Sequence, residues 1–164
     1  MKYFKYTILL FLVGLSACDM GNDPEPGGTA VQAVTGEWFT TFTVNGVDVY
    51  NLGYQLITTS NTAANSADEF LITDRLPNGY SQYAYKLKTP LNLDDKTFGG
   101  TGLVNLVYDI TATITDGKII SKAVNLPSGI VADSIHFNIE FSDDPGTIYT
   151  VGGYRRTGFQ EDEH

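Results

Sequence analysis

One short stretch late in the chain carries the residue types that hydrolysis needs. His136 alternates with apolar residues and shares a strand face with Ser134, Asn138 and Glu140. A hydroxyl nucleophile, an imidazole base and a carboxylate are the parts of a Ser-His-Asp/Glu site. The second histidine, His164, lies in an acidic tail. A hydrolytic triad would therefore have to use His136.

A solvated outer surface explains the same four polar residues. The residues between them are apolar, so the stretch from 134 to 141 has one polar and one apolar face. If the apolar face lines a core, His136 points to solvent. If the interior is polar, the same residues point inward. The Gly-x-Ser-x-Gly turn that exposes a serine nucleophile is missing after residue 17.

The only cysteine, Cys18, stands where a thiol is expected to be acylated. Lys2 and Lys5 precede the apolar run TILLFLVGL, and the run ends at Leu15-Ser16-Ala17-Cys18. A basic start, a short apolar core and small residues before a cleavage point make a secretory signal. The last four residues resemble a bacterial lipobox. We expect a signal peptide over 1–17 and a diacylglycerol on Cys18, and a disulfide is excluded because there is no second cysteine.

The residues after Cys18 predict a flexible tether and an acidic mature chain. Residues 18–35 are rich in Asp, Glu, Pro and Gly and contain few core-forming side chains. Loss of Lys2 and Lys5 leaves eight basic against nineteen acidic side chains, a formal charge of −11. Such a chain repels nucleic acid. The expected location is the cell envelope, lipid-anchored at the outer membrane, and either face of that membrane is compatible with the sequence.

Beyond residue 35 the pattern predicts one all-β domain over 36–160, with an acidic tail at 161–164. Short segments rich in Val, Ile, Thr, Tyr and Phe alternate with Gly, Pro, Asn and Asp. A sandwich or a barrel would bury their apolar faces, and a closed antiparallel up-and-down barrel of about eight strands also removes the exposed edges. The expected strands lie near 36–44, 53–60, 68–73, 80–88, 97–108, 109–115, 118–124, 131–141 and 147–157.

Four turn sequences separate these segments. Asp116-Gly117 predicts a tight hairpin between two strands, because both residues tolerate positive φ. Asn45-Gly46 predicts another. Asp143-Asp144-Pro145-Gly146 and Leu76-Pro77-Asn78-Gly79 place Pro before a residue that suits turns.

Two motifs at opposite ends of the domain carry a family resemblance. Gly36-Glu37-Trp38 resembles the Gly-x-Trp start of lipocalins and other calycins, and Gly153-Tyr154-Arg155-Arg156-Thr157-Gly158-Phe159 lies near the end. Together they resemble the Bacteroides-type lipoprotein family labelled lipid-binding putative hydrolase, over residues 36–162. The resemblance implies a lipocalin-like barrel and lipid binding, but it assigns no catalytic residue. It also implies that a late Arg covers Trp38. Either Arg155 or Arg156 can point inward, and we choose Arg156 because it shares a face with Tyr154.

Neither a metal nor a cofactor is indicated. Asp94-Asp95 and Asp143-Asp144 lack the spacing and the glycine of an EF-hand loop. The glycine-rich segment 98–102 is not followed by Lys-Ser/Thr and a helix, so phosphate binding is not supported.

The aromatic content favours a binding role. Ten Tyr, nine Phe and one Trp suit a cup for a small apolar or amphipathic, lipid-like molecule, although plain core packing would also use them. Two other functions stay open: an esterase-like lipid hydrolase, and a structural accessory protein of an outer-membrane uptake complex with envelope protein partners. The inward-facing candidates for a pocket are Phe42, Tyr83, Tyr85, Tyr108 and Phe137.

Replacing the single thiol tests the lipoprotein prediction. Cys18→Ala should abolish incorporation of labelled palmitate, because no other thiol can accept the diacylglycerol. Metabolic labelling followed by immunoprecipitation measures this, with Ser16→Ala as a control that keeps a small residue before the cysteine. Continued labelling of Cys18→Ala would contradict the prediction.

Overall fold

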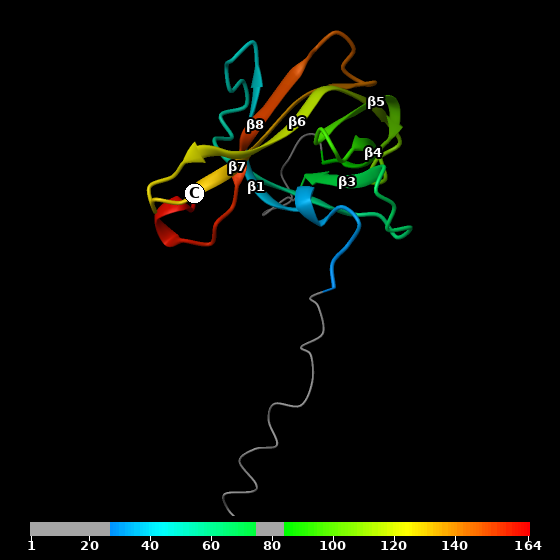
Figure 1. Ribbon diagram of the computed structural model, residues 1–164. Helices are drawn as coiled ribbons and strands as arrows, with labels where there is room; N and C mark the ends of the chain where they lie inside the picture. Colours follow the sequence, from blue (N-terminus) through cyan, green and yellow to red (C-terminus); the bar gives the residue numbers. More distant parts are fainter. Residues whose placement is uncertain (1–26, 75–83) are drawn as a thin grey trace, which may run out of the picture.

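Eight antiparallel strands form a single closed barrel in the computed structural model, which describes residues 27–74 and 84–164 (Figure 1). Two short 3-10 helices, η1 and η2, flank the barrel in sequence. The elements are η1 Gln32–Val34, β1 Gly36–Val44, β2 Gln55–Asn61, β3 Glu69–Asp74, β4 Lys86–Asn92, β5 Thr97–Val104, β6 Thr111–Asn125, β7 Val131–Phe141, β8 Tyr149–Arg155 and η2 Gln160–Asp162.

Each strand pairs with its neighbours in sequence, and β1 pairs with β8 to close the sheet. In this last pairing Trp38 lies opposite Arg155 and Phe42 lies opposite Val151. Closure gives each of the eight described strands a neighbour on both sides. The predicted up-and-down barrel of eight strands is therefore confirmed.

The Asp116-Gly117 hairpin was a wrong prediction. The two segments expected near 109–115 and 118–124 form one strand, β6, which pairs with β7 on both sides of a register shift between Thr115 and Lys118. Asp116 has φ 54°, and a Cβ on Gly117 would lie 2.2 Å from the carbonyl oxygen of Phe98. Positive φ serves a β-bulge as well as a turn, so the same dipeptide fits both.

The other turns that can be compared follow the prediction. Asn45 and Gly46 have φ 50° and 79°, and Val44 and Val47 exchange two backbone hydrogen bonds of 2.9 and 3.0 Å around them. The turn over 143–146 joins β7 to β8. The turn expected at 76–79 and the start of the strand expected over 80–88 lie outside the described residues.

The barrel interior is apolar. Inward side chains recur at every second position, as in β7, where Ile135, Phe137, Ile139 and Phe141 are buried and His136 between them is exposed. A continuous cluster of such residues extends from Trp38 to Tyr149. A polar lumen along β7 is thereby excluded.

One end of the barrel is covered by η1. Val34 of η1 and Val31 just before it are fully buried and belong to the same core cluster as Trp38. The indole Nε1 of Trp38 donates to Thr59 Oγ1 at 2.9 Å, and Thr59 Oγ1 donates to the Val34 carbonyl at 2.7 Å. Residues 31–34 therefore belong to the folded unit, although their composition placed them in the tether.

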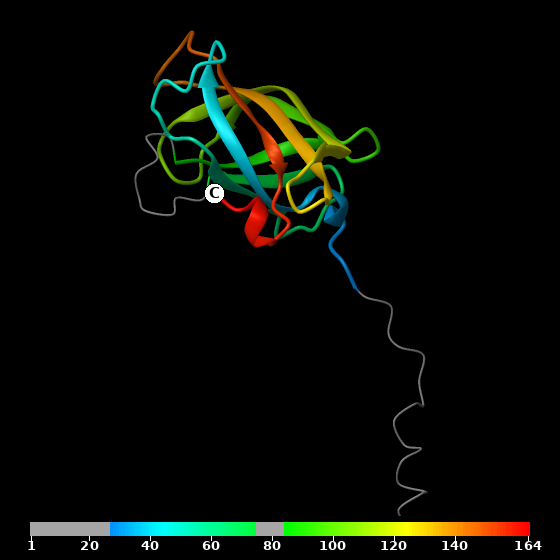
Figure 2. The ribbon, with the colours of Figure 1, turned by 90° about the vertical axis from the view of Figure 1, so that its left-hand side faces the viewer.

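Alternating strand direction gives the barrel two different ends. We call the end covered by η1 the η1 end; the first described residues and the C-terminal segment lie there (Figure 2). We call the opposite end the loop end; it carries loops 45–54, 105–110 and 142–148. Figures 1 and 2 both place the loops after β1 and before β8 away from the start of the described chain.

Truncating the buried indole should destabilise the barrel strongly. Trp38→Ala removes a fully buried ring and the hydrogen bond to Thr59, so we expect a loss of about 3–5 kcal/mol in the free energy of unfolding. Phe159→Ala, at a side chain that is 50% exposed, should change it by less than about 0.5 kcal/mol. Urea denaturation followed by circular dichroism measures both. Equal effects of the two substitutions would contradict the structure.

Candidate functional site

Five aromatic side chains meet at the loop end of the barrel. We call this group, Phe42, Tyr50, Tyr85, Phe141 and Tyr149, the mouth cluster. The Tyr149 ring stacks on Phe42 with centroids 4.6 Å apart and planes 18° apart, and its centroid lies 6.0 Å from that of Phe141. Tyr85 extends the cluster, 5.9 Å from Phe141. Stacked and tilted rings at these distances attract each other beyond their buried area.

The strands place these rings by their alternation. Phe42, Phe141 and Tyr149 occupy inward positions near the loop-end termini of β1, β7 and β8. Tyr149 is 1% exposed, while Phe42 and Tyr50 are only partly buried against the core. Tyr50 comes from the loop after β1, and its ring centroid lies 6.3 Å from that of Tyr149.

A chain of hydroxyl groups crosses the mouth cluster. Tyr149 Oη donates to Asp144 Oδ2 at 2.5 Å, and the hydroxyls of Tyr50 and Tyr149 lie 3.0 Å apart. Asp144 belongs to the turn between β7 and β8. A short hydrogen bond to a carboxylate is among the stronger ones in proteins. The end of an apolar interior thus carries one organised polar group.

Burial and charge both act on Tyr85. Burial of its ring raises the pKa of the Tyr85 hydroxyl well above its usual value, and the negative charge of Asp74 raises it further. The hydroxyl is therefore neutral at physiological pH, and it can donate a hydrogen bond.

Exposed apolar side chains lie in the described loops at the same end of the barrel as the mouth cluster. Three loops that are far apart in sequence contribute them at the same end of the barrel, and each of these side chains is about half exposed or more. They are Val47, Val49, Leu106, Val107, Tyr108 and Ile148. Apolar patches of this kind mark ligand, partner or membrane contacts.

The structure distinguishes among the pocket residues expected from the sequence. Phe42, Tyr85 and Phe137 lie on the inner face, and Phe137 is fully buried. Tyr108 is 52% exposed in the loop before β6 and does not line the interior, because the expected strand over 97–108 ends at Val104. Tyr83 lies outside the described residues. Whether the inward residues bind a ligand stays a prediction.

Sequence reasoning missed three members of the mouth cluster. Phe141 and Tyr149 continue the inward alternation of β7 and β8, so the pattern of apolar positions could have identified them. Tyr50 lies in a loop, where no periodicity applies, and only the fold brings it to Tyr149.

At the η1 end, Arg155 covers Trp38. The Arg155 guanidinium carbon lies 4.6 Å from the indole centroid, and Nη1 donates to the Thr35 carbonyl at 2.5 Å. Trp38 and Arg155 are direct partners in the β1–β8 register, so their side chains lie on the same face. The choice of Arg156 for this contact was wrong, because Arg156 lies on the outer face with Tyr154.

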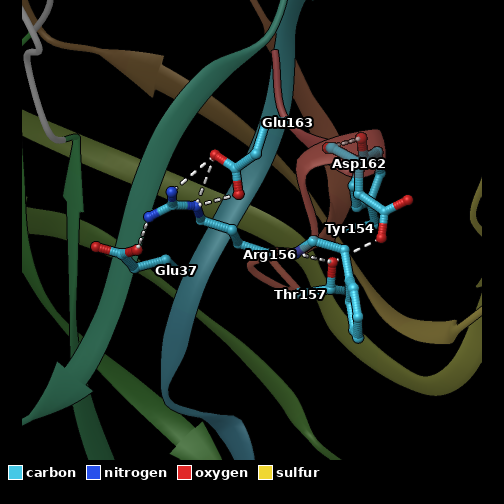
Figure 3. Close-up of polar contacts among 7 residues, drawn as sticks. Glu37, Tyr154, Arg156, Thr157, Asp162 and Glu163 are labelled. Carbon is cyan, nitrogen blue, oxygen red and sulfur yellow. Dashed lines mark hydrogen bonds and ion pairs between the residues drawn. The ribbon is translucent and has the colours of Figure 1, made fainter. Parts of the chain in front are cut away.

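Arg156 instead links the C-terminal segment to the outer wall. Its guanidinium contacts Glu37 Oε2 at 2.8 Å and Glu163 Oε2 at 2.7 Å (Figure 3). Hydrogen bonds from Arg156 lower the pKa of the Glu163 carboxyl despite the opposing effect of burial. The segment expected to be an acidic tail is thus fixed to the barrel.

A second contact of this segment involves a buried carboxylate. Asp162 Oδ1 accepts from the Ser128 backbone N–H at 3.0 Å, and Asp162 Oδ2 accepts from the hydroxyls of Ser128 and Thr157, each at 2.6 Å. Burial acts to raise the pKa of Asp162, but these hydrogen bonds outweigh it and the pKa is lowered. The contact joins the C-terminal segment to the connection between β6 and β7.

Both histidines lie outside the barrel. His136 is exposed on the outer face of β7, and the His164 ring stacks on Tyr54 with centroids 4.0 Å apart. Neither imidazole faces the apolar interior. The four polar residues from 134 to 140 therefore belong to the outer surface.

Other site types receive no support from the described residues. Within 27–74 and 84–164, no group of three or more His, Cys, Asp or Glu is placed to hold a metal ion. No helix in those ranges has the length and apolar character to cross a bilayer.

A shallow, open depression of about 590 Å³ lies at the η1 end, apart from the mouth cluster, and is lined by Thr29, Ala30, Gln32, Ala33, Asp133 and Arg155.

Comparison with known proteins identifies the family. The model of the family described as "lipid-binding putative hydrolase" matches residues 23–160. No curated protein sequence matches the chain. Because the match covers most of the sequence, the chain belongs to this family.

The buried carboxylate predicts a pH-dependent stability. Asp162→Asn should lower the melting temperature by several degrees at pH 7, because the amide cannot accept all three hydrogen bonds. The pKa of Asp162 is lower in the folded state, so its contribution is complete above its unfolded pKa of about 3.9 and is lost as the pH falls through the folded value. In thermal melts from pH 7 to pH 2.5, the difference in melting temperature between Asp162→Asn and the wild type should therefore shrink as the pH falls.

Asp109→Asn provides the matched control, because Asp109 is an exposed carboxylate in a loop. Its melting temperature should follow the wild type across the pH range. A constant difference between Asp162→Asn and wild type down to pH 2.5 would contradict the assignment.

Proposed function

We propose that this member of the lipid-binding family holds a small apolar or amphipathic molecule at the loop end of its barrel. The mouth cluster carries the proposal: five aromatic rings, from β1, the loop after it, the residue just before β4, β7 and β8, converge where the apolar interior approaches solvent. Two of them, Phe42 and Tyr50, are only partly buried, so they have surface left to offer a ligand. Apolar sites with a few placed polar groups are typical of small-molecule binding.

The exposed loop residues around the cluster support the same function. Apolar side chains at the tips of three loops would remain in contact with an alkyl chain as it leaves water. A lipid could then enter the mouth without its chain being fully hydrated at any stage.

We further propose that the protein is a lipoprotein, held in the cell envelope at the outer membrane by acylated Cys18. Nine peptide units separate Cys18 from Gly27, a reach of about 30 Å. The described chain begins at the η1 end (Figures 1 and 2). An anchor there would leave the loop end facing away from the bilayer, toward diffusing ligands or an envelope protein partner.

Binding without chemistry is preferred to ester hydrolysis. The hydrolytic hypothesis needs His136 as the base, and that side chain lies on the outer face, across the wall of β7 from the apolar interior. A lipid held at the mouth cluster would not contact it.

A matched pair of phenylalanines tests where the ligand binds. Native mass spectrometry of the folded domain against extracted membrane lipids should show specific one-to-one adducts. Phe42→Ala removes one ring of the mouth cluster and should weaken the adduct about two- to tenfold. Phe159→Ala removes a half-exposed ring from the C-terminal segment and should leave the adduct unchanged. An equal loss in both variants, or no adduct with the wild type, would reject the proposed site.

An ester-hydrolysis assay run beside it tests the alternative. With p-nitrophenyl esters of matched chain length, the wild type should hydrolyse substrate no faster than the Phe42→Ala or the His136→Ala variant. Turnover by the wild type that disappears in His136→Ala would establish the hydrolase instead.

A further inference from the structure

A second set of exposed apolar side chains lies at the η1 end of the barrel. We infer that this end docks on the surface of the bilayer to which Cys18 anchors the chain. We call the docking surface the η1 patch; it consists of Ile130, Val131 and Phe159, which are 42%, 46% and 50% exposed. This inference rests on the lipid anchor proposed above and adds to it the surface with which the barrel meets the membrane.

One series of hydrogen bonds brings the two loops of the η1 patch together. The Phe159 N–H donates to Thr157 Oγ1 at 3.3 Å, and Thr157 Oγ1 donates to Asp162 Oδ2 at 2.6 Å. From the other side, the Ile130 N–H donates to Ser128 Oγ at 3.3 Å, and Ser128 Oγ donates to the same carboxylate oxygen at 2.6 Å. The turn after β6 and the C-terminal segment therefore lie side by side at the η1 end (Figure 2), and each carries an exposed apolar side chain.

The turn that carries Ile130 has a packed base. Leu126, at the start of this turn, is only 8% exposed. It belongs to an outer cluster whose other buried members are Phe39, Ala132 and Tyr154. The Leu126 N–H also donates to the Ile130 carbonyl at 3.0 Å. The turn is thus held in place before it meets a partner, which reduces the entropy lost on docking.

Charged groups near the η1 patch pair with one another. Asp133 contacts Arg155 Nε at 3.3 Å, and the Arg156 guanidinium contacts Glu163 at 2.7 Å. The turn over 126–130 contains no charged residue. Moving this surface from water to the interface of a bilayer therefore dehydrates few unpaired charges.

The position of the tether distinguishes between the two apolar ends. A larger set of exposed apolar side chains lies at the loop end, but the described chain begins at the η1 end (Figures 1 and 2). The nine peptide units from Cys18 to Gly27 reach about 30 Å, so an anchor keeps the η1 end close to the bilayer. This gives the η1 patch a high effective concentration at the membrane, and the contacts of a few apolar side chains can then hold it there.

Introduced tryptophans test which end meets the bilayer. The mature, acylated protein is reconstituted into phosphatidylcholine vesicles whose acyl chains are brominated near the headgroup, and its emission is compared with that in unbrominated vesicles. Phe159→Trp should lose about half of its added emission, because side chains at interfacial depth contact the bromine atoms. Tyr108→Trp, at a similarly exposed side chain of the loop end, is the matched control and should lose none. The wild type measures the background from Trp38, which is fully buried.

A charge placed in the η1 patch tests the contact itself. Ile130→Asp, combined with Phe159→Trp, should abolish the quenching, because a carboxylate resists transfer out of water. Val47→Asp, at an exposed side chain of the loop end, should leave the quenching of Phe159→Trp unchanged. Circular dichroism melts of each variant verify that the fold is retained. A surface contact of this kind encloses no single lipid molecule, so it leaves the one-to-one adduct expected at the mouth cluster unaffected.

The outcomes separate this inference from the anchor on which it rests. If the wild type carries no acyl group and does not float with the vesicles, the proposed anchor fails and the docking fails with it. If the protein floats but Phe159→Trp is not quenched, the anchor stands and docking of the η1 end is refuted. Quenching of Tyr108→Trp that equals or exceeds that of Phe159→Trp would refute the orientation. Unchanged quenching after Ile130→Asp would refute the role of the η1 patch.

Discussion

The contacts of one buried indole hold together the parts of this barrel that are farthest apart in sequence. Trp38 shares the buried core with Val34 of η1 and with Val31 just before it, donates to Thr59 in β2, and is covered by Arg155 from β8. A hydrogen bond between buried groups is costly to leave unmade, so these positions are coupled rather than independent. The ring thus seals one end and fixes the two strands beside β1.

Sealing one end makes the two ends chemically unequal. At the η1 end the interior stops at fully buried aliphatic side chains and a guanidinium with several partners. At the loop end it stops at partly buried rings, a hydroxyl chain and exposed apolar loops. The ligand site that we propose therefore lies where packing is incomplete, whereas the most completely packed side chains lie at the η1 end.

The sequence predicted the barrel because alternation and turn chemistry are local signals. Period two in β7 separated an apolar face from a polar one, and only the burial of Ile135 and Phe137 shows that the apolar face is the inner one. Asn45-Gly46 identified a real hairpin. Asp116-Gly117 misled because a bulge requires the same backbone freedom as a turn. The sequence could not distinguish Arg155 from Arg156, because only the strand register places Arg155 opposite Trp38. It could not identify Tyr50, because only the path of the loop after β1 brings this residue to Tyr149.

The closing pair of strands also dictates the order in which the chain can fold. Arg155 donates to the carbonyl of Thr35, 120 residues earlier, so β1 emerges long before the strand that completes it. Contacts so distant in sequence carry a large loop-closure entropy and slow folding. Until β8 arrives, β1 presents an unpaired edge beside open apolar surface, the combination that promotes aggregation. The order of the strands thus makes the pairing of β1 with β8 the step that removes both the open edge and the open apolar surface.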